Sequence, residues 1–158
     1  MKQFRNILVG IDLMNVEVAD PVKLRRPSRQ ALARAIWLAS HTHAKLTISS
    51  VLPMPPFMEG LLREQLTDTP AEITGITAEI LNRLVAQARS EGIDARPQCA
   101  VGIPWEELCR QIQLNNHDLV IVGTRDLGYA GRIFFGSTAM RLLRYCPCPV
   151  WVARPDAY

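Results

Sequence analysis

Two features of the 158-residue chain predict an α/β fold with one open, parallel, five-stranded sheet and helices on both faces. Short β-branched, apolar runs alternate with segments whose apolar residues recur at helical spacing. This alternation is typical of right-handed strand-helix-strand units, which assemble into a parallel sheet. Residues 119–122 (Leu-Val-Ile-Val) are apolar throughout, as expected for a strand buried on both faces. We therefore expect one domain over residues 1–158, with its strands in the doubly wound order 3-2-1-4-5.

The first strand and the first helix are expected on either side of a long polar loop. Residues 4–11 form an apolar strand, and Asp12 stands at its carboxyl end. Pro27 and Ser28 suit the start of a helix, which the apolar spacing extends to about His43. The loop between them, 13–26, is longer than most strand-to-helix connections. We interpret its basic residues as a solvated charge cluster in preference to an anion-binding group; they are Lys23, Arg25 and Arg26.

The second strand and the second helix are expected within residues 45–91. Residues 45–52 alternate in polarity and are rich in β-branched side chains, and prolines follow them. The weakly periodic segment 57–70 is interpreted as an ordered excursion or a short helix. Apolar residues at helical spacing over 69–91 then predict a long helix, which Gly92 closes.

The remainder of the chain is expected to add three strands and two helices. The strand 95–101 belongs at an edge of the sheet, because Pro97 cannot donate a ladder hydrogen bond. A helix over 105–115 follows it and leads into the fourth strand. The last helix begins at Gly136, and residues 149–153 form the last strand.

Composition excludes several classes of protein. Hydrophobic residues make up 48% of the chain and charged residues 21%, which is globular rather than disordered. No apolar run approaches the roughly 20 residues that span a bilayer, and the amino terminus lacks a signal-peptide pattern. We therefore expect a cytoplasmic protein with no membrane partner. The formal net charge of +3 is small, so nucleic acid is not expected as a partner either.

The cysteines and histidines lack the spacing of a metal site. The four cysteines are too few for a disulfide scaffold and are interpreted as buried thiols, with no metal expected. The three histidines fall at helix ends or in connections and are interpreted as surface residues. These residues are Cys99, Cys109, Cys146 and Cys148, and His41, His43 and His117.

The segment between the fourth strand and the last helix indicates an anion site. Gly123 ends the strand, and Gly136 and Ser137 begin the helix. The first N–H groups of a helix have no partner within it and its dipole favours negative charge there, so phosphate is the expected anion. A plain connection with an ordinary Ser cap is the alternative. Asp12 would face the same crevice, since the doubly wound order places strands one and four side by side. It could bind a ribose or base, or its own loop's N–H groups.

Motifs along nearly the whole chain resemble those of the universal stress protein family. They are Ile-Leu-Val-Gly-Ile-Asp12, Ser28-x-x-Ala31-Leu32, Leu46-Thr-Ile-Ser-Ser-Val51, Gly102-x-Pro104, Asp118-Leu-Val-Ile-Val-Gly123 and Cys148-Pro-Val-Trp-Val. Each is weak alone, but the set in this order is specific. The resemblance implies a Rossmann-like fold of the adenine nucleotide alpha hydrolase type. It also implies a stress-response protein that binds an adenine nucleotide, ATP or AMP, with or without Mg²⁺.

The resemblance also implies which residues contact the nucleotide. The family's ATP-binding branch has Gly, two residues, Gly, nine residues, Gly and then Ser or Thr. That spacing is retained here, but the second glycine is replaced by Asp126. The glycines and hydroxyls of the motif would hold phosphate or ribose, Asp12 the ribose or base, and the backbone of Val51 the adenine. The expected site residues are Gly10, Asp12, Val51, Val122, Gly123, Arg125, Asp126, Gly136, Ser137 and Thr138.

Asp126 leaves two functions open. Its carboxylate would repel a phosphate charge about 5 Å away by roughly 1 kcal/mol in water and about 3 kcal/mol at an effective dielectric near 20. If Arg125 or a divalent cation offsets this repulsion, the protein is a non-catalytic nucleotide-binding sensor or regulator. Otherwise it is a nucleotide-free dimeric interaction module in which Asp126 has disabled ATP binding.

Catalysis and assembly complete the expectations. No general base is recognisable near Gly136, so at most a weak ATPase activity is expected. The resemblance implies a homodimer that pairs through the last strand. The apolar residues of that strand, which would otherwise form an exposed edge, are Val150, Trp151 and Val152.

Overall fold

Five parallel strands form one sheet in the order β3-β2-β1-β4-β5, which confirms the predicted fold class. The computed structural model describes residues 3–14, 24–54, 69–124 and 135–154. The strands are β1 (Asn6–Gly10), β2 (Lys45–Pro53), β3 (Ala95–Gly102), β4 (Leu119–Gly123) and β5 (Val150–Ala153). The strand that contains Pro97 lies at one edge, as predicted, and β5 lies at the other.

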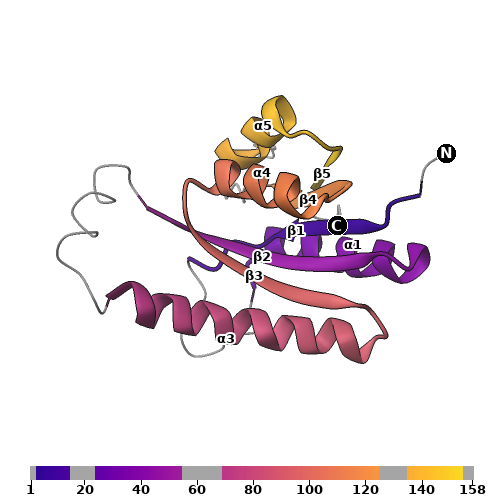
Figure 1. Ribbon diagram of the computed structural model, residues 1–158, viewed down its shortest axis with the longest axis horizontal. Coiled ribbons are helices and arrows are strands. Elements are labelled where there is room, and N and C mark those ends of the chain that lie inside the picture. Colours follow the sequence, from indigo (N-terminus) through magenta and orange to yellow (C-terminus); the bar gives the residue numbers. More distant parts are fainter. Residues whose placement is uncertain (1–2, 15–23, 55–68, 125–134, 155–158) are drawn as a thin grey trace.

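Helices cover both faces of the sheet. They are α1 (Arg26–Thr42), α3 (Thr69–Ser90), α4 (Pro104–Asn115) and α5 (Gly136–Tyr145). Figure 1 shows α4 and α5 together above the sheet and α3 below it. The buried side chains of α1 and α3 belong to one apolar cluster and those of α4 and α5 to another. The predicted bounds of these helices agree with the structure to within about two residues. The excursion predicted for 57–70 falls almost wholly outside the described residues.

The two central strands meet as the doubly wound order requires. β1 pairs with β4 in parallel, and the register places Gly10 beside Val122. Both strands therefore end at the same level, and the connections that follow them leave the sheet at one edge. The side chains of Ile7, Val9 and Ile121 are fully buried on the face covered by α1 and α3.

One prediction about surface residues is wrong. The other two histidines are exposed, but His117 is only 5% exposed. The carboxylate of the next residue, Asp118, accepts hydrogen bonds from the N–H groups of Arg5 (2.8 Å) and Asn6 (3.0 Å). The Asp118 N–H in turn donates to the Asn6 carbonyl at 2.9 Å. These bonds draw the connection between α4 and β4 against the start of β1, which encloses the imidazole.

Within the described part of the chain, no helix combines the length and the apolar character that crossing a bilayer requires.

Candidate functional site

A cleft of about 710 Å³ opens at the carboxyl ends of β1 and β4. The ends of these strands form its base, and the first turn of α5 forms one wall together with the start of α4. Eight of the ten predicted site residues line it: Gly10, Asp12, Val51, Val122, Gly123, Gly136, Ser137 and Thr138. The other two, Arg125 and Asp126, lie outside the described residues. The structure thus brings the eight positions together, and their contact with a nucleotide remains a prediction.

The first turn of α5 presents backbone N–H groups beside this cleft. Gly136 begins the helix with φ of 77°, in the left-handed region that an L side chain rarely adopts. Phe135 occupies the N-cap position, and no side chain of the described residues makes a capping hydrogen bond there. The alternative of an ordinary Ser cap is therefore wrong. Because the first N–H groups of a helix lack intrahelical acceptors, this end of α5 can bind an anion.

Two arginines contribute positive charge to the cleft wall. Arg25 lies 3.9 Å from the carboxylate of Asp12, and both side chains are about half exposed (42% and 56%). Such an exposed pair contributes roughly 0–1 kcal/mol and leaves the guanidinium able to meet a ligand. Arg141, one turn beyond Ser137 on α5, stands 5.5 Å from the ring centroid of Trp105. The interpretation of Arg25 as only a solvated charge is incomplete, since it lines the cleft.

Asp12 makes the contacts of a loop-start residue while it faces the cleft. Its carboxylate accepts a hydrogen bond from the N–H of Met14 at 3.0 Å, as in an Asx turn. Its own N–H donates to the hydroxyl of Ser28 at 3.0 Å, which connects the end of β1 to the start of α1. The second carboxylate oxygen, which faces Arg25, remains open to a hydroxyl donor. The two roles weighed for Asp12 are therefore compatible.

Gly123 is required by packing as well as by any ligand. A β-carbon at this position would lie 2.5 Å from the carbonyl oxygen of Pro27, and that oxygen belongs to the backbone of α1. A real β-carbon does not approach backbone so closely, so either α1 or β4 would have to shift. Close packing of α1 against the end of β4 therefore requires glycine at this position, whether or not a phosphate binds nearby.

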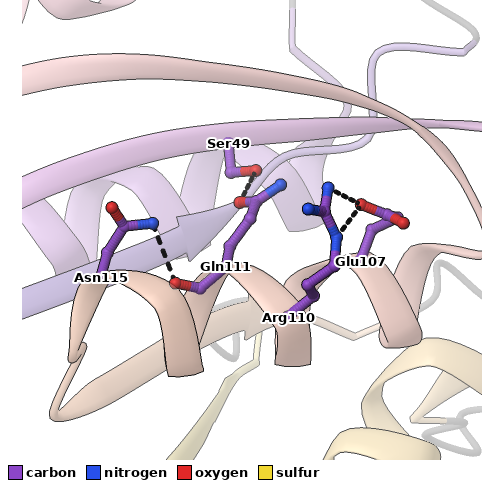
Figure 2. A network of polar contacts seen from close by, with 5 residues as sticks. All are labelled: Ser49, Glu107, Arg110, Gln111 and Asn115. Carbon is purple, nitrogen blue, oxygen red and sulfur yellow. Dashed lines mark hydrogen bonds and ion pairs between the residues drawn. The ribbon is translucent and has the colours of Figure 1, made fainter.

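A buried hydrogen bond supports the wall formed by β2. The hydroxyl of Ser49, which lines the cleft, donates to Oε1 of Gln111 on α4 at 2.7 Å (Figure 2). Asn115 on the same helix donates to the Gln111 carbonyl, and Arg110 pairs with Glu107 at 2.6 Å. The amide Nε2 of Gln111 is buried and has no hydrogen-bond partner among the described residues. The Ser49–Gln111 bond thus joins α4 to β2 behind the cleft, while the other two contacts lie within α4.

Trp105 and Arg141 are among the cleft residues that sequence reasoning missed. A signal existed for Arg141, because it lies four residues after Ser137 and a helix places such residues on one face. Trp105 lies three residues after the end of β3, at the carboxyl edge where open α/β sheets bind ligands. Within the described ranges, no group of three or more His, Cys, Asp or Glu residues is placed to hold a metal ion.

Comparison with known proteins identifies the relatives of this fold. The model of the universal stress protein family matches residues 3–154. The chain is 28% identical over 165 residues to universal stress protein E of Photorhabdus laumondii. That match covers all of this chain but 48% of the relative, so the chain spans about half of that relative's length.

Two solved structures share the fold. Hypothetical protein MJ0577 superposes with a TM-score of 0.77 at 15% identity, covering 99% of this chain and all of that one. The universal stress protein from Archaeoglobus fulgidus in complex with dAMP gives a TM-score of 0.64 at 18% identity, covering 96% of this chain and 99% of that one.

Proposed function

Because this chain belongs to the universal stress protein family, we propose that it binds an adenine nucleotide, ATP or AMP, in the cleft at the ends of β1 and β4. In this proposal the protein is a non-catalytic, homodimeric sensor or regulator of the stress response. The observation that carries it is the start of α5, whose uncapped first turn lines the cleft. A phosphate there would meet backbone N–H groups and the positive end of the helix dipole.

Further support comes from the rest of the cleft and from a relative. Arg25 and Arg141 both line the cleft and can contribute charge-assisted hydrogen bonds to phosphate oxygens. The open oxygen of Asp12 suits a ribose hydroxyl, and Val51 at the end of β2 suits the base. The relative from Archaeoglobus fulgidus, which has this fold, was solved with dAMP. We expect the phosphates at α5 and the ribose at Asp12, with Mg²⁺ as an accompanying ion of ATP.

Calorimetric titration with ATP and with AMP, each with and without Mg²⁺, tests this proposal. The purified chain should bind at least one of these nucleotides, and heat denaturation of the protein as purified should release nucleotide. Failure to bind any of them at millimolar concentration would contradict it. Asp126→Gly then distinguishes the two functions: a gain of ATP binding over a parent that binds none would favour the nucleotide-free interaction module.

A matched pair of glycine variants separates binding from folding. Gly136 and Gly92 have nearly equal positive φ values, 77° and 82°, but Gly92 ends α3 and does not line the cleft. An alanine at either position incurs a similar backbone strain, roughly 1–2 kcal/mol. Gly136→Ala should weaken nucleotide binding by about tenfold or more, while Gly92→Ala should leave it unchanged. Equal losses of affinity in both variants would attribute the effect to stability.

The proposed dimer uses the open edge of β5. The carbonyls of Pro149 and Ala153 accept hydrogen bonds from β4, so by the alternation of the ladder Val150 and Val152 direct their backbone groups outward. Their side chains are only half-buried. On the adjacent helix α5, three large apolar side chains are exposed: Met140, Leu143 and Tyr145. An outward-facing strand beside apolar surface suits pairing with a second copy.

Proline substitution tests this edge. Val152→Pro removes an outward N–H without touching the bonds to β4, so it should convert a dimer to a monomer in sedimentation equilibrium. Val101→Pro is the matched control. Val101 lies on β3, the opposite edge strand, and its backbone N–H points away from the sheet, as the backbone of Pro97 on the same strand does. A monomeric parent, or a dimer that withstands Val152→Pro, would contradict pairing through β5.

A further inference from the structure

Three cysteine thiols gather away from the cleft, where α4, the end of α5 and the start of β5 meet. Cys146 is the C-cap residue of α5, and Cys148 follows two residues later in the connection to β5. Their sulfur atoms are 3.6 Å apart. Cys109 on α4 belongs to the same cluster, and it lies close enough to Cys146 for the two thiols to influence each other's pKa. All three are half-buried rather than enclosed, so a small solute can reach the cluster.

The hydrogen bonds distinguish Cys146 from its two neighbours. The Cys148 thiol, whose sulfur lies 3.6 Å from that of Cys146, lowers the pKa of Cys146 to about 6 against the opposing effect of burial, and the nearby Cys109 thiol adds a smaller lowering effect. The pKa of Cys109 is raised to about 11, first by burial and then by the Cys146 charge. The pKa of Cys148 is raised as well, mainly because its S–H hydrogen bonds to Cys146. These shifts favour a thiolate at Cys146 beside two protonated thiols near neutral pH, and the thiolate is the nucleophilic form of cysteine.

We propose that Cys146 is a hydroperoxide-reactive thiol and that Cys148 traps its oxidised form in a reversible Cys146–Cys148 disulfide. This site is separate from the nucleotide cleft, because none of the three cysteines lines it. The class of oxidant is a hydroperoxide, with hydrogen peroxide as the simplest member. A dithiol reductant restores the two thiols by exchange.

The chemistry proceeds in two balanced steps. The Cys146 thiolate attacks one peroxide oxygen, the O–O bond breaks, and the product is a sulfenic acid with hydroxide that takes a proton to become water. The sulfur of Cys148 then attacks the sulfur of Cys146. The S–O bond breaks, the S–S bond forms, and the hydroxyl leaves as a second water with the proton of Cys148. Two thiols are oxidised by two electrons in total, and one peroxide is reduced to two waters.

The location of Cys148 suits it to close this bond. The two sulfurs must move from 3.6 Å to about 2.05 Å, the length of a disulfide. Residues 146–149 belong to neither a helix nor a strand, so the approach breaks no ladder. Cys109 is instead fixed on a regular helix, α4, and acts as a positioning residue through its electrostatic effect on Cys146. Cys99, on β3, provides a control thiol whose pKa is raised by burial.

Peptide mapping of the purified full chain tests the proposal. After limited treatment with hydrogen peroxide, free thiols are alkylated and the chain is digested with trypsin. Cleavage after Arg144 places Cys146 and Cys148 on one peptide, while Cys99 and Cys109 share another, within which fragmentation of the peptide assigns the modified cysteine. The expected product is a single peptide that has lost two hydrogen atoms and escapes alkylation, and that regains both alkyl groups after reduction. A cross-link between the Cys109 and Cys146 peptides, or equal oxidation of Cys99, would overturn the proposal.

Variants assign the individual roles. Cys146→Ser should abolish peroxide consumption at this cluster, and Cys99→Ser should leave it unchanged. Cys148→Ser should accumulate a sulfenic acid that dimedone labels at Cys146. Cys109→Ala should shift the pH profile of the reaction to higher pH and slow it several-fold at neutral pH. An unchanged reaction in Cys146→Ser, or labelling at Cys148 in preference to Cys146, would overturn the assignment.

Discussion

The two faces of the sheet differ in how completely their apolar side chains are enclosed. The face under α1 and α3 carries the larger core, in which Ile7 and Leu81 have no exposed surface. The face under α4 and α5 carries a smaller cluster around Leu142. Several of its neighbours are only half-buried, namely Val150, Val152 and the cysteines of the thiol cluster. The first face is expected to contribute most of the stability, since buried apolar area drives folding.

The less enclosed face carries most of the groups to which we assign proposed functions. The cleft wall made by α5, the thiol cluster and the open edge at β5 all belong to it. A group that contacts a ligand, an oxidant or a second chain cannot be fully buried. The side chains on this face are therefore less tightly packed than those on the other. Several large apolar side chains are exposed on α5. On α1, among the residues described, Trp37 is the one large apolar side chain that is exposed.

The largest expected effect tests the two cores directly. Leu81 and Leu142 both have no exposed surface, one in each cluster. Leu81→Ala should lower the free energy of unfolding by about 2–5 kcal/mol, the range for a buried leucine, and Leu142→Ala should fall at the lower end of it. The reason is that half-buried neighbours can move into the space that Leu142 leaves. Urea denaturation measures both, and an equal or larger loss for Leu142→Ala would break the comparison.

A second pair of variants compares the faces at the strand ends. A β-carbon at Gly123 would collide with the backbone of Pro27, whereas one at Gly10 would lie 3.1 Å from a methyl group of Val122 and near the Leu108 side chain. Gly123→Ala should destabilise by about 1–3 kcal/mol, and Gly10→Ala by less, because side chains give way more easily than a helix backbone. Thermal unfolding of both variants decides the order, and the reverse order would contradict it.

A third prediction concerns the opposite end of the sheet from the cleft. Burial, followed by the charge of Arg96, lowers the pKa of His117 below that of an unfolded chain. The unfolded state therefore binds more protons, and this contribution to stability is complete above about pH 6.5 and lost as the pH falls through the folded pKa. His117→Gln should therefore lose less unfolding free energy than the parent between pH 7.5 and 5. Urea titrations at both pH values measure it, and His43→Asn, at an exposed position, should change nothing.

The smallest expected effect on stability belongs to Asp12. Its pair with Arg25 is long and exposed, and asparagine can keep the Asx turn with Met14. Asp12→Asn should change the free energy of unfolding by less than about 0.5 kcal/mol. Nucleotide affinity in the calorimetric titration should still fall several-fold if the carboxylate binds ribose. A variant that loses stability and keeps its affinity would assign Asp12 to the loop alone.

Much of this architecture could be predicted from local patterns. The uninterrupted apolar run at 119–122 indicated a strand buried on both faces, and Pro97 indicated an edge strand. Both predictions depend on periodicity and backbone chemistry, which neighbouring residues carry. The convergence of Asp12 and Gly136 on one crevice followed from the doubly wound order alone.

Other features depend on contacts between residues far apart in the chain. His117 is buried because Asp118 binds the N–H groups at the start of β1, and Gly123 is required because Pro27 approaches it. The residues next to His117 and Gly123 in the sequence do not predict these contacts. The thiol cluster is of the same kind, since Cys109 meets Cys146 only after α4 packs beside α5.

The amino-acid sequence by itself thus determined the order of the elements, the sheet that they form and the strand ends where the cleft opens, because hydrophobic period and helix-terminal residues act over short distances. Only the tertiary structure decided which charges enter the cleft, which glycine is held by a neighbouring helix and which thiol becomes a thiolate. These properties are set by distances of a few ångströms between side chains that the chain brings together only when it is packed.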